Sequence, residues 1–221
     1  DTIKVAVIGC GGRGTGAAMQ ALLSKQNVKL VAMADAFRDR LDDCYKALTS
    51  EDNDEGNVKS KVAVTEETKF VGFDAYAKAI PLADVVILTT PPGFRPIHFA
   101  EAIKQGKHVF MEKPVATDPA GIKKVLETAQ IAKQKKLNVV VGLQRHYQNS
   151  YLELYKRVQD GMIGEITSGQ VWWNNDGVWV NLRKPGQTEM EYQMRNWYYF
   201  NWLCGDHINE QHIHNIDVMN W

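Results

Sequence analysis

The N-terminal segment places a predicted strand directly before glycines whose spacing suits a pyrophosphate. Residues 3–8 form an apolar run, and Gly9, Gly11 and Gly14 follow with the spacing G-x-G-x-x-G. Such glycines allow a tight turn, a close approach of phosphates to the backbone, and close packing of the next helix on the sheet. A helix predicted over residues 15–24 would then direct its free N–H groups toward the anion.

A second predicted strand ends in an acidic residue. Residues 27–35 form a mostly apolar run that ends at Asp35, about 20 residues after Gly14, where a carboxylate accepts hydrogen bonds from ribose hydroxyls. The order strand, loop, helix, strand and acid favours dinucleotide binding over an ordinary glycine-rich turn. Asp35 would repel a 2′-phosphate, which favours NAD over NADP. Arg38 could offer that phosphate a partner, so NADP stays the less favoured alternative.

The pattern continues as strands that alternate with helices. Further strands are predicted over residues 69–73, 84–89, 108–111 and 138–143, and further helices over 40–48, 97–105 and 120–136. This alternation predicts right-handed βαβ crossovers in an α/β, doubly wound parallel sheet, a Rossmann domain that spans residues 1–145. The acidic stretch 50–57 is predicted to be a solvated insertion.

The character of the chain changes in residues 146–221. Helices are predicted over 151–160 and 210–221, and an alternating strand over 165–173. Five of the six tryptophans lie between Trp172 and Trp202, where they can line a sugar pocket or pack in a core, and the core is favoured for most of them. We expect the beginning of a second α+β, open-sheet domain. Because the chain stops inside a helical pattern without a cap, we expect this domain to be truncated.

Composition excludes several classes of partner. Lys+Arg and Asp+Glu number 26 each and the pI is about 7.2, so no net field attracts nucleic acid or an anionic membrane surface. No run approaches the roughly 20 apolar residues of a membrane span. Cys10, Cys44 and Cys204 form no C-x-x-C pair and are predicted to be free thiols. We expect a cytoplasmic protein, although a start at Asp1 leaves open a removed leader and a periplasmic location.

A lysine follows one of the predicted strands at the sheet edge that binds ligands. Glu112, Lys113 and Pro114 come directly after the strand 108–111, at the carboxyl edge of the sheet. A lysine held there can hydrogen-bond a substrate hydroxyl and stabilise a developing alkoxide. For a lone Lys-Pro, an exposed lysine in the turn after a strand is the favoured interpretation.

The C-terminal helical pattern gathers polar side chains. At about 100° per residue, one face carries His207, Glu210, His214, Asp217 and Trp221. His212 falls on another side of the helix. On this face His214 could accept a proton, with Glu210 one turn earlier to orient it. A solvated face and a divalent-metal site remain alternatives, although H-E-x-x-H is absent and we assign no metal ligands.

Several of these motifs together resemble the Gfo/Idh/MocA oxidoreductase family. They are the glycine loop with Asp35, Thr90-Pro91-Pro92 followed by His98, the stretch from Gly106 to Pro114 (GKHVFMEKP), and His214-x-x-Asp217. The resemblance covers nearly the whole chain, and the segments 195–200 and 210–215 resemble a bacterial branch. It implies a Rossmann domain, a second domain with a large open sheet, and hydride transfer between a nicotinamide and a sugar or polyol carbon. Lys113 and His214 match the family's catalytic lysine and histidine, and Glu210 stands where many members carry Asp.

The pattern and the resemblance together give the candidate site residues. The catalytic candidates are Lys113, His214 and Glu210. The cofactor-binding candidates are Gly9, Gly11, Gly12, Arg13, Gly14, Asp35, Arg38, Thr90, Pro91, Pro92, His98, Glu112, Lys113 and Gln144. The substrate-binding candidates are Arg145, Trp173, Arg195, Trp197 and His214.

The resemblance leaves two other functions open. Some relatives cleave glycosides with bound NAD through transient oxidation and elimination. A non-catalytic nucleotide-binding regulator is the third possibility, against which the retention of Lys113 and His214 argues. The expected partners are a small sugar or polyol and, for the full-length protein, further copies of itself.

Overall fold

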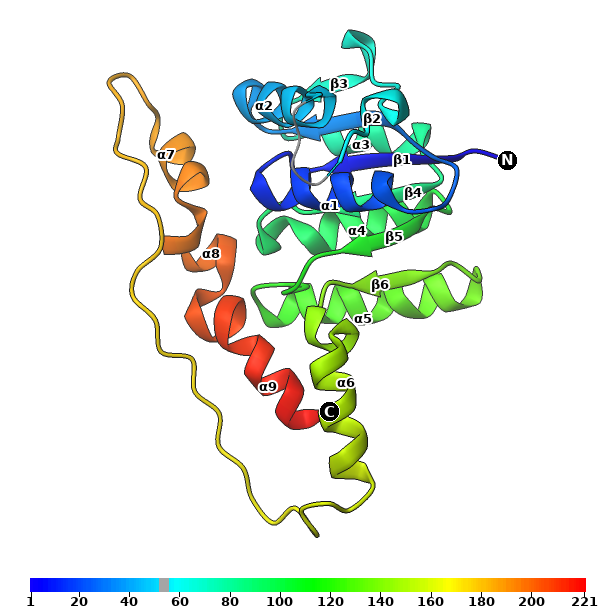
Figure 1. Cartoon of the computed structure of the whole chain (residues 1–221). Helices are drawn as coiled ribbons and strands as arrows, with labels where there is room; N and C mark the ends of the chain where they lie inside the picture. Colours follow the sequence, from blue (N-terminus) through cyan, green and yellow to red (C-terminus); the bar gives the residue numbers. More distant parts are fainter. Residues whose placement is uncertain (52–55) are drawn as a thin grey trace. The chain divides into compact units, whose positions relative to one another are not determined.

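The computed structural model describes residues 1–51 and 56–221, and its chain forms two compact units, Asp1–Val141 and Gly142–Trp221 (Figure 1). The sequence places the domain boundary after residue 145. Residues 52–55, half of the predicted acidic insertion 50–57, lie outside the described residues.

The first unit is built on a six-stranded parallel sheet with the strand order β3-β2-β1-β4-β5-β6. Its strands are β1 (Ile3–Ile8), β2 (Val28–Asp35), β3 (Lys69–Val71), β4 (Val85–Leu88), β5 (His108–Met111) and β6 (Val139–Val141). The predicted doubly wound sheet is therefore confirmed, with β3, β4 and β6 shorter than expected. The strand order reverses between β1 and β4, and this reversal is the place where such sheets bind ligands.

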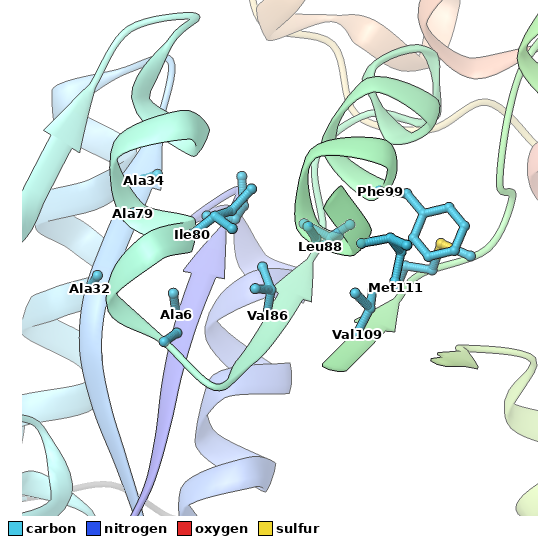
Figure 2. Close-up of a cluster of buried hydrophobic side chains, with 14 of the residues drawn as sticks. Ala6, Ala32, Ala34, Ala79, Ile80, Val86, Leu88, Phe99, Val109 and Met111 are labelled. Carbon is cyan, nitrogen blue, oxygen red and sulfur yellow. The ribbon is translucent and has the colours of Figure 1, made fainter. Parts of the chain in front are cut away.

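Helices cover both faces of this sheet. They are α1 (Gly12–Leu23), α2 (Arg38–Thr49), α3 (Ala75–Ala79), α4 (Arg95–Lys104) and α5 (Pro119–Gln134). Val5 and Val7 of β1 are buried in one apolar cluster with residues of α1 and α2. Ala6 and Ile8 of the same strand belong to a second cluster, with residues of α3, α4 and α5. Figure 2 shows Ala6 in this cluster with Ala79 of α3 and Phe99 of α4. This alternation is what a strand buried on both faces requires.

All the regular secondary structure of the second unit is helical. Its helices are α6 (Asn149–Gln159), α7 (Glu189–Arg195), α8 (Asn201–Cys204), a π-helical turn over Ile208–His212, and α9 (Ile213–Asn220). Short 3₁₀ turns occupy Gln144–Tyr147 and Trp197–Tyr199 in this unit, and Lys59–Lys61, Glu66–Thr68, Ile80–Leu82 and Pro92–Phe94 in the first unit.

The predicted strand over residues 165–173 is wrong. Residues 142–221, all of which are described, contain helices and no strand. A strand needs a neighbour to satisfy its backbone groups, and this alternating segment has none there, so its backbone stays extended and mostly exposed. The expected α+β character of this part is therefore absent from these residues.

The predicted burial of most tryptophans is also not met. Trp172 is 65% exposed, and Trp179 and Trp202 are exposed as well. Trp172 and Trp179 lie in the extended segment, which supplies no second layer to cover their rings.

Candidate functional site

Two glycines of the N-terminal loop are required by the fold itself. Gly9 has φ +98°, and a Cβ on it would lie 2.6 Å from the backbone nitrogen of Thr90. A Cβ on Gly14 would lie 1.8 Å from the carbonyl oxygen of Gly9. Gly9 therefore permits the turn between β1 and α1, and Gly14 permits the close packing of α1 on the end of β1.

The next two glycines face open space. A Cβ on Gly11 or Gly12 would meet nothing within 4 Å. Gly11 caps α1 without a side-chain hydrogen bond, and the first turn of α1 carries no acidic residue. α1 begins at Gly12, earlier than predicted, so its N-terminal N–H groups belong to the loop itself. This open cradle at a helix N-terminus fits the diphosphate of a dinucleotide.

Asp35 stands beside this cradle at the end of β2. Its carboxylate accepts hydrogen bonds from the backbone N–H of Cys10 at 2.6 Å and of Phe37 at 2.8 Å. Burial raises the pKa of this carboxyl group, and the two backbone N–H groups oppose that rise. Each oxygen keeps a second lone pair, so the carboxylate can still accept hydrogen bonds from ribose hydroxyls.

Arg38 is engaged by carboxylates other than Asp35. Its Nε lies 2.9 Å from Asp42, and its Nη2 lies 2.8 Å from Glu66. Hydrogen bonds to Asp42 and Glu66 raise the pKa of this exposed guanidinium. A 2′-phosphate would therefore have to compete with two carboxylates for this side chain.

Side chains of α4 support the loop that follows β4. Thr90 Oγ1 lies 3.1 Å from Nδ1 of His98, which is buried and packs against the ring of Tyr76. Burial, with the nearby positive charge of Arg95, lowers the pKa of His98 to about 3, so this histidine is neutral at physiological pH. Pro91 caps the short turn that Pro92 begins. His98 thus supports the predicted cofactor loop through Thr90.

The loop after β5 is tied to the glycine loop. Glu112 is buried, and its Oε1 lies 2.6 Å from Nε of Arg13. Lys113 follows and is partly exposed, and the Lys113–Pro114 peptide bond is cis. Four of the predicted cofactor-binding segments therefore meet at the carboxyl edge of the sheet: the glycine loop, Asp35, the Thr90 loop and the Glu112-Lys113 loop.

Sequence reasoning missed Arg95 in this unit. The first residue of α4, it donates hydrogen bonds to the carbonyl oxygens of Thr90, Glu112 and Pro114. A single arginine belongs to no spaced motif, so no signal in the sequence marked it.

In the second unit, three predicted substrate-binding residues come together. Arg145 Nη1 donates to the carbonyl oxygen of His214 at 3.1 Å, and the guanidinium lies 5.8 Å from the ring centroid of Trp173. The rings of Trp173 and His214 are 5.8 Å apart. Asn215 also accepts a hydrogen bond from Arg145 and donates one to the carbonyl oxygen of Trp172. Gln144 opens the 3₁₀ turn that carries Arg145.

The predicted polar face assumed a constant rotation of about 100° per residue, and the helix does not keep that rotation. The π-helical turn Ile208–His212 has more residues per turn than an α-helix, so the 100° step fails across it. Asp217 instead pairs with His146 at 2.8 Å, and the ring of Trp221 packs 4.2 Å from that histidine. His146 was missed because its partners lie about 70 residues later in the chain.

The remaining candidates have other neighbours. Arg195 pairs with Glu191 at 3.0 Å, one turn earlier in α7, and the ring of Trp197 lies 4.9 Å from that of Tyr198. Glu210 is buried. The pKa of Tyr198 is raised, first by the burial of that tyrosine and second by the negative charge of Glu210.

Residues 1–51 and 56–221 contain neither a cluster of metal ligands nor a helix that could span a membrane. In that part of the chain no group of three or more His, Cys, Asp or Glu side chains could hold a metal ion. None of its helices combines the length and apolar character needed to cross a membrane. The prediction of free thiols is confirmed, since Cys10, Cys44 and Cys204 are buried and unbridged.

Comparisons with known proteins agree with this geometry. Residues 3–143 match the model of the oxidoreductase family with an NAD-binding Rossmann fold, GFO_IDH_MocA. Inositol 2-dehydrogenase of Gluconacetobacter diazotrophicus is 30% identical over 143 residues, 65% of this chain and 36% of that protein. The scyllo-inositol 2-dehydrogenase (NADP(+)) of Bacillus subtilis is 36% identical over 95 residues, 42% of this chain and 25% of that protein.

A solved structure gives the same result. Scyllo-inositol dehydrogenase of Lactobacillus casei, with bound NAD(H) and scyllo-inositol, matches with a TM-score of 0.57 and 28% identity over 76% of this chain and 44% of that one. Each match spans less than half of the relative's length. With the family model matched over most of the Rossmann unit, the chain belongs to the Gfo/Idh/MocA family of oxidoreductases with an NAD-binding Rossmann fold.

Proposed function

We propose that this chain carries the cofactor-binding domain and part of the substrate-binding region of an NAD-dependent dehydrogenase that oxidises a hydroxyl carbon of a cyclic sugar or polyol. One observation carries the proposal: the open cradle over Gly11 and Gly12 beside the carboxylate of Asp35. The two relatives described above are named inositol dehydrogenases, and these names support the substrate class.

The proposed cofactor is NAD rather than NADP. Asp35 would repel a 2′-phosphate, and Arg38, the nearest candidate to bind one, is engaged by Asp42 and Glu66. Because one relative is named for NADP(+), the preference needs direct measurement.

The proposed chemistry divides between two side chains. Bound NAD⁺ supplies the acceptor for the carbinol hydride. Lys113 donates a hydrogen bond to the reacting oxygen and stabilises its developing negative charge. His214 accepts the hydroxyl proton, and Glu210 is proposed to orient it. Arg145 and Trp173 would hold the substrate ring, since the hydroxyl groups of a sugar accept from a guanidinium and its apolar face packs on an indole.

The cofactor part is tested by calorimetric titration of NADH and NADPH into the whole protein and into Asp35→Ala. We expect NADH to bind more tightly than NADPH, and Asp35→Ala to weaken NADH binding by about tenfold or more. Tighter binding of NADPH to the unmodified protein would contradict the cofactor preference.

The chemical part is tested by turnover of a panel of cyclic polyols and aldoses in Lys113→Met and His214→Ala. Lys107→Met is the matched control, because Lys107 lies before β5 and donates to the carbonyl of Pro81. We expect both site variants to lose about 100-fold or more in kcat, and the control to keep it. Unchanged turnover in either site variant would contradict its role. Cleavage of an aryl glycoside without net NADH would instead indicate oxidation and elimination.

A further inference from the structure

Arg95 is a buried arginine at the start of α4, with 2% of the residue exposed. Its Nη1 donates to the carbonyl oxygen of Glu112 and, at 2.8 Å, to that of Pro114. Its Nη2 donates to the carbonyl oxygen of Thr90. One side chain thus binds three backbone carbonyls that follow two neighbouring strands, β4 and β5.

These three carbonyls frame the position of Lys113. Glu112 and Pro114 precede and follow it, so the backbone is held on both sides of the lysine. Thr90 opens the predicted cofactor loop, and its hydroxyl is fixed by His98 from the same helix. The N-terminal half of α4 therefore fixes the backbone around Lys113 and the predicted cofactor loop relative to each other.

The energetics favour placement over stability as the role of this guanidinium. Burying a charged side chain removes its hydration, and a well-packed apolar residue of similar volume often stabilises a fold as well or better. A planar guanidinium, however, can bind several carbonyls at once in fixed directions, which an apolar side chain cannot do and a lysine ammonium does poorly.

We infer that Arg95 is a positioning residue: it fixes where Lys113 stands relative to the loop Thr90-Pro91-Pro92. The inference rests on the proposed function, in which Lys113 acts on the reacting oxygen. A displacement of about 1 Å in a catalytic group costs on the order of 100-fold in rate. The effect is therefore expected in turnover and in the order of the two loops, with a smaller loss of cofactor affinity, because the cradle over Gly11 and Gly12 and the carboxylate of Asp35 do not depend on Arg95.

The test compares Arg95→Met with Phe99→Leu in the whole protein. Phe99 is fully buried on the same helix in the apolar cluster under the sheet, so its truncation weakens packing without removing a bond to either loop. Amide hydrogen exchange is measured for peptides that cover residues 89–94 and 112–116, together with the melting temperature and NADH affinity. We expect Arg95→Met to speed exchange in both peptides by about tenfold or more, and Phe99→Leu to change it less than threefold, at comparable melting temperatures.

Turnover of a polyol that the unmodified protein oxidises supplies the second readout. Arg95→Met should lower kcat, measured at saturating NAD⁺, by about 30-fold or more, while NADH affinity falls by less than about tenfold. Combined with Lys113→Met, it should cost little more than Lys113→Met alone, because both changes remove the same interaction. If Arg95→Met does not fold, Arg95→Lys takes its place with an expected loss of about tenfold.

The outcomes separate this inference from the proposed function. Unchanged exchange in both loops, or a loss of kcat equal to that of Phe99→Leu, overturns the role of Arg95. Additive losses in the double variant overturn it as well. If Lys113→Met itself keeps full turnover, the proposed function fails, and the exchange data alone then decide whether Arg95 orders the two loops.

Discussion

The guanidinium of Arg38 donates to the carboxylate of Glu66 at 2.8 Å, across 28 residues of sequence. Together with Asp42 at 2.9 Å, this carboxylate engages the side chain nearest in sequence to Asp35 that could bind a 2′-phosphate. We therefore predict that discrimination against NADP depends on these two acids as well as on Asp35.

Replacing both partners should relax that discrimination. The double variant Asp42→Asn/Glu66→Gln keeps the side-chain shapes but removes two negative charges, so NADPH affinity should rise by about three- to tenfold while NADH affinity stays the same. Calorimetric titration measures both. Glu51→Gln is the control, since Glu51 pairs with Lys59 in another exposed ion pair of the same unit. An equal gain in the control would attribute the effect to net charge.

The glycines of the N-terminal loop have two different roles: Gly14 is needed for folding, and Gly11 is proposed to be needed for cofactor binding. A Cβ on Gly11 meets open space and its backbone φ of −72° suits alanine, so Gly11→Ala should keep the melting temperature of the protein without cofactor. The methyl group would occupy the diphosphate position, and NADH affinity should fall about tenfold or more. Gly14→Ala should instead destabilise the fold itself, because its Cβ would collide with the Gly9 carbonyl oxygen. Wild-type NADH binding by Gly11→Ala would contradict the placement of the diphosphate.

His98 gives the first unit a predictable sensitivity to acid. Its pKa is about 3 in the fold, against an ordinary value of 6.5, so below pH 6.5 the unfolded chain binds a proton that the native state refuses. The stability that neutral His98 contributes is therefore present above pH 6.5 and is lost as the pH falls toward 3. The expected loss from this group between pH 7 and pH 5 is about 2 kcal/mol.

Urea unfolding at several pH values measures that loss. His98→Asn retains an acceptor for Thr90 but has no titrating ring, so its free energy of unfolding should fall less steeply with acidification. Equal slopes in the two proteins would show that His98 is accessible to protons in the native state.

The sequence predicted the first unit well because its signals are local. Each strand is a short apolar run, and the glycine spacing belongs to one turn. Asp35 ends β2 and Lys113 comes two residues after β5, so the parallel strands bring both residues to one edge of the sheet. Arg95 and the pairing of Arg38 with Glu66 could not be predicted, because they depend on which carbonyl or carboxylate the fold brings near.

The second unit was predicted less well because its signals depend on neighbours. Residues 165–173 alternate like a strand, but alternation forms a strand only when another strand pairs with it. The π-helical turn at Ile208–His212 has no sequence pattern of its own, and it changes which side chains share a face with His214. Periodicity could not predict the contact between Trp173 and His214 either, because the two residues lie in different segments of the chain that only the fold brings together.

The cluster of Arg145, Trp173 and His214 yields the last prediction. Arg145 holds the backbone of His214 through its carbonyl oxygen and lies over the rings of Trp173 and Tyr151. In Arg145→Lys the ammonium cannot reproduce the planar, multiply bonded geometry of the guanidinium. We expect kcat/KM for a polyol substrate to fall by about 10- to 100-fold, with NADH affinity unchanged, because the loss lies in the second unit.

A matched arginine provides the control for this prediction. Arg183 lies 4.2 Å over the ring of Tyr192 and pairs with Glu189, so Arg183→Lys changes the same kind of arginine–aromatic contact elsewhere in the unit. Steady-state kinetics and NADH titration of both variants decide the matter. Arg183→Lys should keep kcat/KM within about threefold, since an exposed ion pair contributes little. If the two variants lose activity equally, Arg145 supports the fold of the second unit and has no particular role toward the substrate.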